Sequence, residues 1–299
     1  MSIGEWMIGK VIKKHGGFYS VDTETAFFDC KLSGKQKHRQ RDHIVAGDFV
    51  EFEPEANSDV PRGYITAIRE RKNFIPRPGI ANVDQILIVA AIREPSYDFL
   101  LLDKLTALSR YYKIPPTLCF SKMDLADPQS EQEVRDYYRN TDIGLLFVGQ
   151  NDPLDVVHDF CREKTTVLTG NSGVGKSSMI NRLLGREVQV VQDISMKLNR
   201  GKNTTRTAEF LPFENGFIVD TPGFSALDLP PEILKTDLKE LYPDYQHAAA
   251  DCRFNNCIHI NEPDCEVKAL VEEGVLDEAR YQNYKKMVLE LEERERMRR

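Results

Sequence analysis

The pattern of apolar and polar positions divides the chain into three parts. Over residues 1–72, five strand-length segments show partial alternation of apolar and polar residues and are separated by glycine-containing or polar turns. Their sequences are GKVIKK, GFYSVDT, AFFDCKL, GDFVEFEP and GYITAIRER. Short strands at this density are typical of a small closed barrel such as the OB-fold. We therefore predict an OB-like β-barrel over residues 1–72.

From residue 73 onward, strand-length apolar runs alternate with helical segments. DQILIVAAI and PPTLCFS have the pattern of strands, and FLLLDKLTALSRYY between them has the period of a helix; GLLFVG, TTVLTG and GFIVD continue the series. Such alternation implies parallel strands with crossover helices on both faces of a sheet. We predict an α/β domain over residues 73–230 and a mostly helical domain over residues 231–299, which ends in a charged amphipathic helix.

Composition and charge are those of a soluble globular protein. Hydrophobic residues make up 41% of the 299 residues and charged residues 29%, and the net charge of −7 argues against general coating of nucleic acid. No run approaches the roughly 20 apolar residues of a membrane span, and the N-terminus lacks the features of a secretory signal. We expect a cytoplasmic monomer that does not contact membranes. The isolated cysteines Cys30, Cys119 and Cys161 should be buried and free.

Two stretches carry clustered cations. The first, KLSGKQKHRQRDH, lies between two predicted strands and contains Lys31, Lys35, Lys37, Arg39 and Arg41. A charge run of this kind is compatible with a solvated loop, but barrel loops are also where such folds bind oligonucleotides. The second is the C-terminal helix, where arginines alternate with glutamates, so that an RNA contact and a plain solvated helix both remain open; these residues are Arg294, Arg296, Arg298 and Arg299.

The segment GNSGVGKSS matches the phosphate-binding pattern G-x-x-x-x-G-K-[ST], with a predicted strand before it and a predicted helix after it. The glycines let backbone N–H groups surround a phosphate, and the helix directs its positive end at the same anion. Lys176 would reach the β- and γ-phosphates, and the Ser177 hydroxyl would bind Mg²⁺. The residues assigned to phosphate binding are Gly170, Asn171, Ser172, Gly173, Val174, Gly175, Lys176, Ser177 and Ser178.

Two further segments carry the chemistry of phosphate hydrolysis. VDTPGF places Asp220 and Gly223 in a D-x-x-G pattern, in which the carboxylate would support Mg²⁺ and the glycine N–H would meet the γ-phosphate. In NRGKNTTRT, one threonine would bind Mg²⁺ while the γ-phosphate is present. We favour Thr205 because T-T-R recurs in related switch loops, with Thr204 as the alternative. The residues assigned to catalysis are Lys176, Thr205, Asp220 and Gly223.

The residues that select the base precede the phosphate loop. CFSKMDL is close to the N-K-x-D signature of GTPases, and the residues assigned to nucleotide binding are Ser121, Lys122, Met123 and Asp124. The Asp124 carboxylate would accept hydrogen bonds from guanine N1–H and N2–H₂, which adenine lacks, and such pairing discriminates by about 10⁴-fold. Lys122 would pack along the base and ribose. Serine replaces the usual asparagine at position 121, which we expect to loosen the hydrogen bonding of the loop.

A metal-binding pattern lies in CRFNNCIHINEPDC, with the spacing C-x4-C-x-H-x5-C. Three thiolates and one imidazole complete a tetrahedral Zn²⁺ shell with no open position, so we predict one structural zinc ion that folds a segment with little core of its own. An iron–sulfur cluster is the alternative, although it usually requires four cysteines. The predicted ligands are Cys252, Cys257, His259 and Cys265.

The base reader, phosphate loop, switch and D-x-x-G follow one another in a circularly permuted order, between a predicted barrel and a predicted metal cluster. Through SKMD, GNSGVGKSS, ISMKLNRGKNTTR, DTPGF and the metal motif, nearly the whole chain resembles the bacterial ribosome small-subunit-dependent GTPase A family. The resemblance implies a GTPase, with GTP or GDP and Mg²⁺, that acts in late maturation of the small ribosomal subunit near the decoding region. It also implies slow hydrolysis that the subunit stimulates, and contacts of the barrel and C-terminal domain with ribosomal RNA.

Two positions depart from the patterns of related GTPases. Family members commonly carry a histidine just before the switch threonines, where this chain has Asn203, and the apolar Phe224 stands where many regulatory GTPases have a water-orienting glutamine. We therefore expect slow intrinsic hydrolysis. An RNA-binding module whose GTPase domain senses nucleotide and barely hydrolyses it is the alternative function. A GTP-dependent metal chaperone would need exposed ligands beyond the closed set of four, and the sequence offers none.

Overall fold

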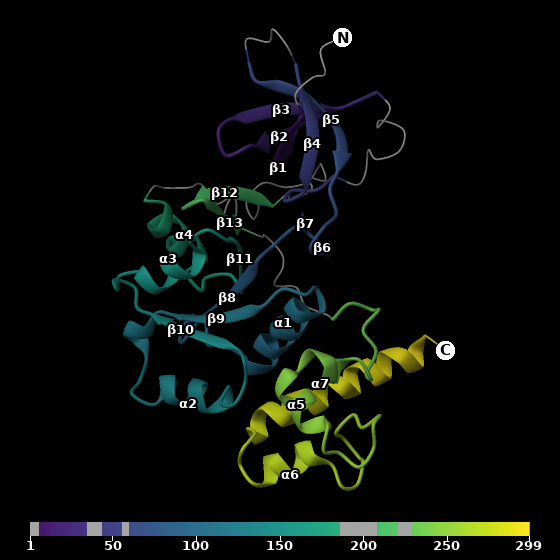
Figure 1. Cartoon of the computed structure of the whole chain (residues 1–299). Helices are drawn as coiled ribbons and strands as arrows, with labels where there is room; N and C mark the ends of the chain where they lie inside the picture. The colour runs from purple at the N-terminus through teal and green to yellow at the C-terminus, as the bar shows by residue number, and fades with distance from the viewer. Residues whose placement is uncertain (1–5, 35–43, 56–59, 186–207, 221–228, 299) are drawn as a thin grey trace. The chain divides into compact units, whose positions relative to one another are not determined.

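The chain forms two compact units. The computed structural model describes residues 6–34, 44–55, 60–185, 208–220 and 229–298 (Figure 1). The first unit contains residues 1–86, 154–169 and 176–224, and the second contains residues 87–153, 170–175 and 225–299. Within the described ranges, no helix combines the length and the apolar character that crossing a bilayer requires.

The first five strands close into a barrel in the order β1-β2-β3-β5-β4 (Figure 1). Neighbouring strands are antiparallel, except that β3 and β5 are parallel. A closed barrel of this kind confirms the OB-like barrel that the alternating pattern predicted. The strands are β1 (Met7–His15), β2 (Phe18–Asp22), β3 (Phe27–Leu32), β4 (Phe49–Pro54) and β5 (Arg62–Ile68).

Apolar positions that alternate along these strands meet in one buried cluster. A glycine is required where β1 crosses β2, because a Cβ atom at Gly9 would lie 2.4 Å from Val21 Cγ1 and 2.7 Å from the Asp22 carbonyl oxygen. The predicted burial of the isolated cysteines is confirmed, since Cys30, Cys119 and Cys161 are all buried and form no disulfide. The barrel cluster contains Val11, Tyr19, Val21, Cys30, Leu32, Ile44, Val50, Phe52 and Ile65.

A short hairpin that the sequence patterns did not predict follows the barrel. It consists of β6 (Phe74–Pro76) and β7 (Gly79–Ala81), which pair antiparallel. The segment that leads into it is held by the fully buried carboxylate of Asp48, which accepts from Arg71 Nε at 2.7 Å and Nη2 at 2.9 Å and from the Val45 N–H at 2.9 Å. A bidentate pair of this geometry orients both partners.

One sheet of six strands has the order β10-β9-β8-β11-β13-β12 (Figure 1). β9 and β10 pair in parallel, as do β11 and β13, while β12 and β13 form an antiparallel hairpin whose turn residues, Glu214 and Asn215, both have positive φ. Every residue of β8 is buried, as expected of an apolar central strand. The strands are β8 (Gln85–Ala91), β9 (Pro116–Ser121), β10 (Gly144–Val148), β11 (Thr165–Thr169), β12 (Glu209–Phe213) and β13 (Gly216–Asp220).

Helices alternate with these strands and then make up the C-terminal region. Asp98 caps α1 by accepting from the Leu100 N–H, and Asp277 caps α7 by accepting from the Arg280 N–H, both at 2.9 Å. The helices are α1 (Phe99–Tyr111), η1 (Met123–Leu125), α2 (Ser130–Tyr137), α3 (Asp155–Cys161), α4 (Lys176–Leu184), η2 (Leu238–Leu241), α5 (Pro243–Ala249), α6 (Glu266–Glu272) and α7 (Glu278–Met297).

Within the second unit, a buried polar network ties α7 to α1, α2 and α5. Arg280 of α7 forms an ion pair with Asp244 of α5, and its Nε lies 3.9 Å from Asp103 Oδ1 of α1. The other Asp103 oxygen accepts from the Tyr137 hydroxyl at 2.6 Å, which in turn accepts from Asn283 Nδ2 at 2.7 Å. Burial raises the pKa of Asp103 to about 6, against the opposing effect of the Arg280 charge. One guanidinium thus serves two buried carboxyl groups.

Replacing Arg280 with alanine should therefore be strongly destabilising, because it leaves Asp103 and Asp244 buried without a cation. We expect Arg280→Ala to lower the free energy of unfolding by about 3–5 kcal/mol. Arg296→Ala, on the same helix, removes a side chain that is 75% exposed and pairs with Glu292, and should cost about 0.5 kcal/mol or less. Urea unfolding of both variants measures the difference, and equal losses would contradict the role assigned to the network.

Candidate nucleotide site and metal centre

The loop after β9 presents an exposed carboxylate in a fixed position. Lys122 adopts a left-handed conformation, with φ of 57°, and η1 follows it directly. The Gln150 N–H donates to Asp124 Oδ1 at 2.6 Å, and the Lys122 ammonium donates to the Glu94 carbonyl. Asp124 is exposed, so its carboxylate is accessible to a planar base with N–H donors.

A single hydroxyl joins this loop to the phosphate loop. The Ser121 side chain is buried and its Oγ lies 2.6 Å from the Val174 carbonyl oxygen and 3.2 Å from that of Ala90, so the hydroxyl donates mainly to Val174. That serine loosens the hydrogen bonding of the loop relative to asparagine stays a prediction. In this structure the serine side chain contacts the phosphate loop directly, through the Val174 carbonyl.

The phosphate loop needs glycine for two separate reasons. A Cβ atom at Gly170 would lie 2.0 Å from the Val89 carbonyl oxygen, so the loop passes too close to β8 for any side chain. Gly173 and Gly175 have φ values of 80° and 95°, in the left-handed region that favours glycine. The loop follows β11 and leads directly into α4, so it has the strand before it and the helix after it that the motif requires.

In the first unit, a lysine and an aspartate lie near one another where the phosphate loop ends. Lys176, the first residue of α4, is buried; burial lowers the pKa of its ammonium group, and the nearby Asp220 carboxylate opposes that shift. Asp220 ends β13, where it is in register with Leu168 of the parallel strand β11. Parallel register thus brings the D-x-x-G aspartate beside the strand that leads into the phosphate loop.

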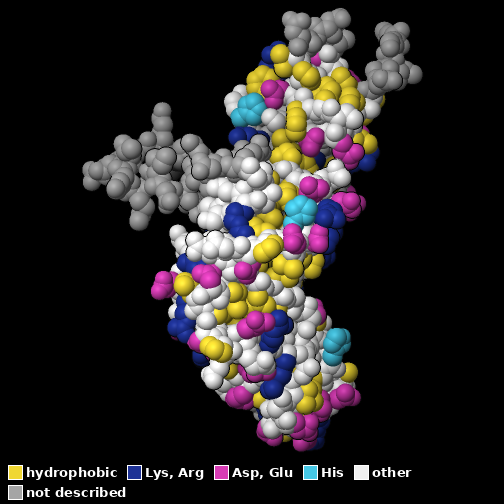
Figure 2. Space-filling view, turned by 90° about the vertical axis from the view of Figure 1, so that its left-hand side faces the viewer, with side chains coloured by type: hydrophobic (Ala, Val, Ile, Leu, Met, Phe, Trp, Pro, Cys, Tyr) yellow, Lys and Arg dark blue, Asp and Glu magenta, His cyan; other side chains and the backbone are white. Residues whose placement is uncertain are grey.

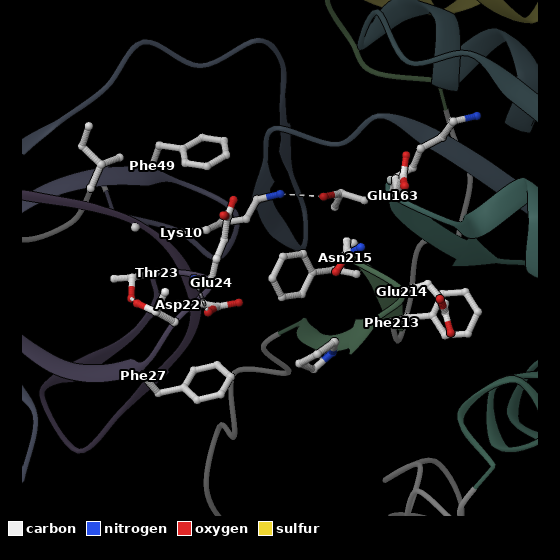
Figure 3. A pocket seen from close by; sticks show the side chains of 18 of the residues that line it. Lys10, Asp22, Thr23, Glu24, Phe27, Phe49, Glu163, Phe213, Glu214 and Asn215 are labelled. Carbon is white, nitrogen blue, oxygen red and sulfur yellow. Dashed lines mark hydrogen bonds between the residues drawn. The ribbon is translucent and has the colours of Figure 1, made fainter.

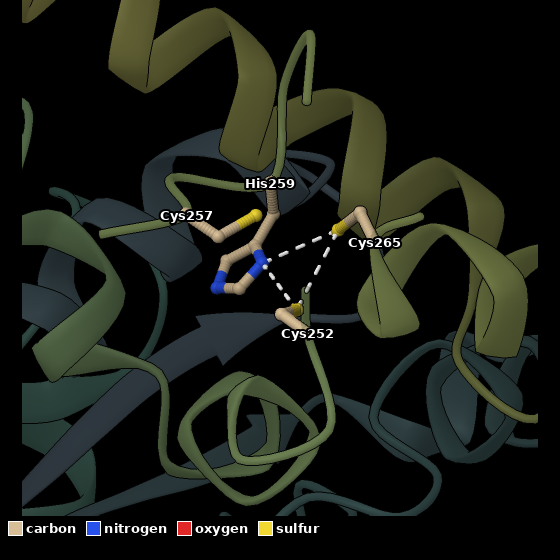
Figure 4. Close-up of side chains that lie close together, drawn as sticks. All are labelled: Cys252, Cys257, His259 and Cys265. Carbon is tan, nitrogen blue, oxygen red and sulfur yellow. Dashed lines mark hydrogen bonds between the residues drawn. The ribbon is translucent and has the colours of Figure 1, made fainter. Parts of the chain in front are cut away.

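The four predicted metal ligands lie together in the C-terminal region (Figure 4). Their ligand atoms all lie within 4.8 Å of one another. Cys252 Sγ and Cys265 Sγ are 3.9 Å apart, and His259 Nδ1 lies 3.4 Å from Cys265 Sγ and 3.7 Å from Cys252 Sγ. The histidine therefore turns Nδ1, rather than Nε2, toward the sulfur atoms.

These separations fit a tetrahedral zinc ion. Zinc–sulfur bonds of about 2.3 Å and zinc–nitrogen bonds of about 2.0–2.1 Å place two sulfurs about 3.8 Å apart and a nitrogen about 3.6 Å from a sulfur. Burial also lowers the pKa of His259 to about 4, so its imidazole is neutral near pH 7, as ligation requires. The donor set and its dimensions suit a closed structural site.

Residues outside the ligand set hold the metal-binding loop in shape. The Glu262 carboxylate accepts from three backbone N–H groups, those of Ile258 at 2.8 Å, Ile260 at 2.9 Å and Asn261 at 3.0 Å. From α7, the Tyr281 hydroxyl donates to the His259 carbonyl at 2.8 Å. The loop between Cys257 and Cys265 is therefore fixed both by its own glutamate and by the C-terminal helix.

Comparison with known proteins identifies the family. Residues 68–230 match the RsgA GTPase family and residues 8–65 match the RsgA N-terminal domain. The chain belongs to the RsgA GTPase family. A relative from Bacillus cereus, named small ribosomal subunit biogenesis GTPase RsgA, is 40% identical over 291 residues, which are 96% of this chain and 98% of that protein. A relative of the same name from Caldanaerobacter subterraneus subsp. tengcongensis is 36% identical over 297 residues, 97% of each chain.

Two solved structures share the fold along nearly the whole chain. YloQ, described as a circularly permuted GTPase, aligns with a TM-score of 0.82 and 32% identity over 97% of this chain and 96% of its own. YjeQ from Thermotoga maritima aligns with a TM-score of 0.79 and 30% identity over 96% of this chain and 99% of its own. The predicted family and permuted fold are confirmed. As a member of the RsgA GTPase family, the chain is a GTPase, which implies GTP or GDP and Mg²⁺ as ligands.

Several predicted residues lie outside the described part of this RsgA family member. They are Lys35, Lys37, Arg39, Arg41, Asn203, Thr204, Thr205, Gly223, Phe224 and Arg299. On the C-terminal helix, Arg294 and Arg298 donate to the carbonyls of Leu229 and Pro231. Both arginines therefore hold α7 to the segment that precedes the C-terminal helices.

Sequence reasoning missed the groups that position the ligands. The sequence only weakly indicates a role for Glu262, as the one acidic residue between His259 and Asp264 in the metal motif. Its three backbone partners depend on the conformation of the loop and could not be predicted. Val174 was assigned to phosphate binding, but nothing in the sequence indicated its contact with Ser121, because a backbone carbonyl makes that contact.

Glu262→Ala should weaken metal binding without removing a ligand, because three backbone N–H groups of the metal-binding loop lose their acceptor. We expect the apparent zinc affinity to fall by about 10–100-fold, as with other groups that orient metal ligands. Competition with a chromophoric chelator measures this change. Glu272→Ala, at an exposed position on α6, is the matched control and should leave the affinity unchanged. Equal affinities for the two variants would show that Glu262 does not orient the ligands.

Proposed function

We propose that this chain acts in late maturation of the small ribosomal subunit, and that the subunit stimulates its GTP hydrolysis. One observation carries the nucleotide part: the base-reading loop and the phosphate loop are joined by the Ser121–Val174 hydrogen bond in a member of the RsgA GTPase family. The ribosomal part rests on relatives that match along nearly their whole length and are named for biogenesis of that subunit. The same proposal includes a cytoplasmic monomer.

The proposed site assigns one task to each loop. Asp124 selects guanine, and Lys122 packs along the base. Residues Gly170 to Ser178 surround the phosphates, with the Lys176 ammonium directed at the β- and γ-phosphates. Ser177 and Thr205 would hold Mg²⁺, Asp220 would support it, and Gly223 would donate to the γ-phosphate; when bound, Mg²⁺ neutralises charge that develops on the phosphate oxygens.

Neither Asn203 nor Phe224 carries the usual water-orienting side chain, so the proposed enzyme depends on its partner for turnover. The barrel supplies cations for a contact with ribosomal RNA: Lys31 Nζ lies 4.4 Å from the centre of the half-buried Phe18 ring, and the exposed Lys14 is on the neighbouring strand. Cations beside aromatic rings suit single-stranded RNA. The Cys/His cluster would hold one structural Zn²⁺.

The proposal is tested by GTP hydrolysis of the purified chain with and without purified small ribosomal subunits, with ATP as the control. We expect slow hydrolysis of GTP alone, strong stimulation by the subunit, and no stimulated hydrolysis of ATP. Hydrolysis that is fast without the subunit, or indifferent to it, would contradict the proposal. A single-turnover rate that stays near zero with bound subunits would instead favour an RNA-binding module that only senses nucleotide.

Base selection by Asp124 is tested by exchanging its carboxylate for an amide. Asp124→Asn loses an acceptor for the guanine N2–H₂ group but gains a donor for the oxygen that xanthine carries at the same position. We expect the affinity for GTP to fall at least about 100-fold while that for xanthosine triphosphate rises. Asp127→Asn, three residues further along the same loop, should change neither affinity. Unchanged GTP binding by Asp124→Asn would remove Asp124 from the site.

A further inference from the structure

Within the first unit, a cavity of about 930 Å³ opens between the barrel and the β11–β13 end of the sheet. Figure 3 shows Lys10, Glu24, Phe27 and Phe49 on the barrel side, and Glu163, Phe213, Glu214 and Asn215 on the other side. None of the residues assigned to nucleotide or metal binding lines it. The cavity is therefore a separate feature from the sites described above.

The positive charges of the cavity are already engaged. Lys10 is buried at its floor, where Nζ donates to Thr165 Oγ1 at 2.5 Å and lies 5.1 Å from the centre of the Phe217 ring. Lys164 Nζ donates to Gln85 Oε1 at 3.2 Å. Each ammonium group thus has a partner within the protein; the Lys10 side chain is buried and that of Lys164 is exposed.

The cavity is lined by more carboxylates than ammonium groups, and some of the carboxylates have no partner among the described residues. Five carboxylates line the cavity, and for two of them, Glu24 and Glu163, the described part of the chain supplies no hydrogen-bond or ion-pair partner. Among the described residues, Glu214 lies 3.7 Å from His158. Asp84 pairs with Lys72 at 3.1 Å and accepts from the Thr165 N–H at 2.8 Å, and Asp22 accepts from the Glu24 N–H at 3.0 Å. Together the five are Asp22, Glu24, Asp84, Glu163 and Glu214.

Apolar side chains lie among these acids. Phe27 is 54% exposed, Ile8 46% and Phe49 39%, so three large hydrophobic groups face solvent within one cavity. On the face shown in Figure 2, acidic and basic side chains are interspersed. The combination of free carboxylates with exposed rings selects for a ligand that is both cationic and apolar.

Nucleic acid does not fit this chemistry, because its phosphates would face five carboxylates. We propose that the cavity docks an extended, Lys/Arg-rich protein segment, with its cations paired to Glu24 and Glu163 and separate apolar side chains packed on Phe27 and on Phe49. This proposal rests on the proposed function in that it places the segment on a protein of the small ribosomal subunit. The barrel would then contact RNA with the strands around Lys31, and protein with the turn that carries Asp22 and Glu24.

The occupant is identified by photo-crosslinking in the full-length protein. Phe27 is replaced by p-benzoyl-phenylalanine, and the protein is bound to small subunits with a non-hydrolysable GTP analogue. The matched control carries the same replacement at Phe18, beside Lys31 and outside the cavity. We expect position 27 to crosslink to a Lys/Arg-rich protein segment and position 18 to RNA. Crosslinking of position 27 to RNA, or its failure to crosslink in a bound complex, would overturn the proposal.

A second measurement does not require the ribosome. A fluorescein-labelled nonapeptide of alternating Arg and Leu is titrated with the protein, and its anisotropy is followed. We expect Glu24→Lys with Glu163→Lys to weaken its binding at least about tenfold, and the exposed pair Glu272→Lys with Glu273→Lys to leave it unchanged. Equal binding by wild type and the cavity variant would overturn the docking site. If the cavity variant binds the peptide more weakly but the wild-type protein does not bind subunits, the docking site is supported and the proposed function is contradicted instead.

Discussion

The carboxyl ends of parallel strands lie along one edge of a sheet, and the loops assigned to the proposed nucleotide site follow such strand ends. Because the edge is shared, the order in which the chain visits the strands does not matter. β9 ends at Ser121 long before the chain reaches β11, yet the Ser121 hydroxyl bonds to Val174, 53 residues later. β11 and β13 likewise place Leu168 and Asp220 in register. Circular permutation therefore changes the connections and leaves the loops where the strands put them.

The sequence was most informative where periodicity or spacing is set by local geometry. Alternation along the barrel strands predicted their buried faces, and the two fixed glycines of the G-x-x-x-x-G-K-[ST] spacing, Gly170 and Gly175, both have positive φ, at 135° and 95°. The cysteine and histidine spacing predicted a cluster that the structure brings together. In each case the pattern reports on residues that are neighbours along the chain or on one face of an element.

Where prediction failed, the deciding contact came from far along the chain or from the backbone. The sequence patterns assigned no role to Lys10, yet aromatic rings from β4, β12 and β13 lie around its ammonium group. The β6–β7 hairpin was missed because its strands are only three residues long and the first of them ends in Pro76. His259 faces the thiols through Nδ1, and its backbone lies in the left-handed region with a φ of 61°. The identity of the residue does not predict this conformation.

Net charge is a poor guide to what such a protein binds, because charge acts over short distances. At physiological ionic strength the screening length is about 8 Å, so a surface responds to its own side chains and not to the sum of −7 over the chain. Lys31 over the Phe18 ring forms one local field, and the carboxylates around Phe27 form another of opposite sign. A ribosomal particle presents both phosphates and basic protein segments. The positive patch of the barrel would complement the phosphates, and its negative patch would complement the basic segments. The two contacts together would fix the orientation of the barrel more closely than either alone.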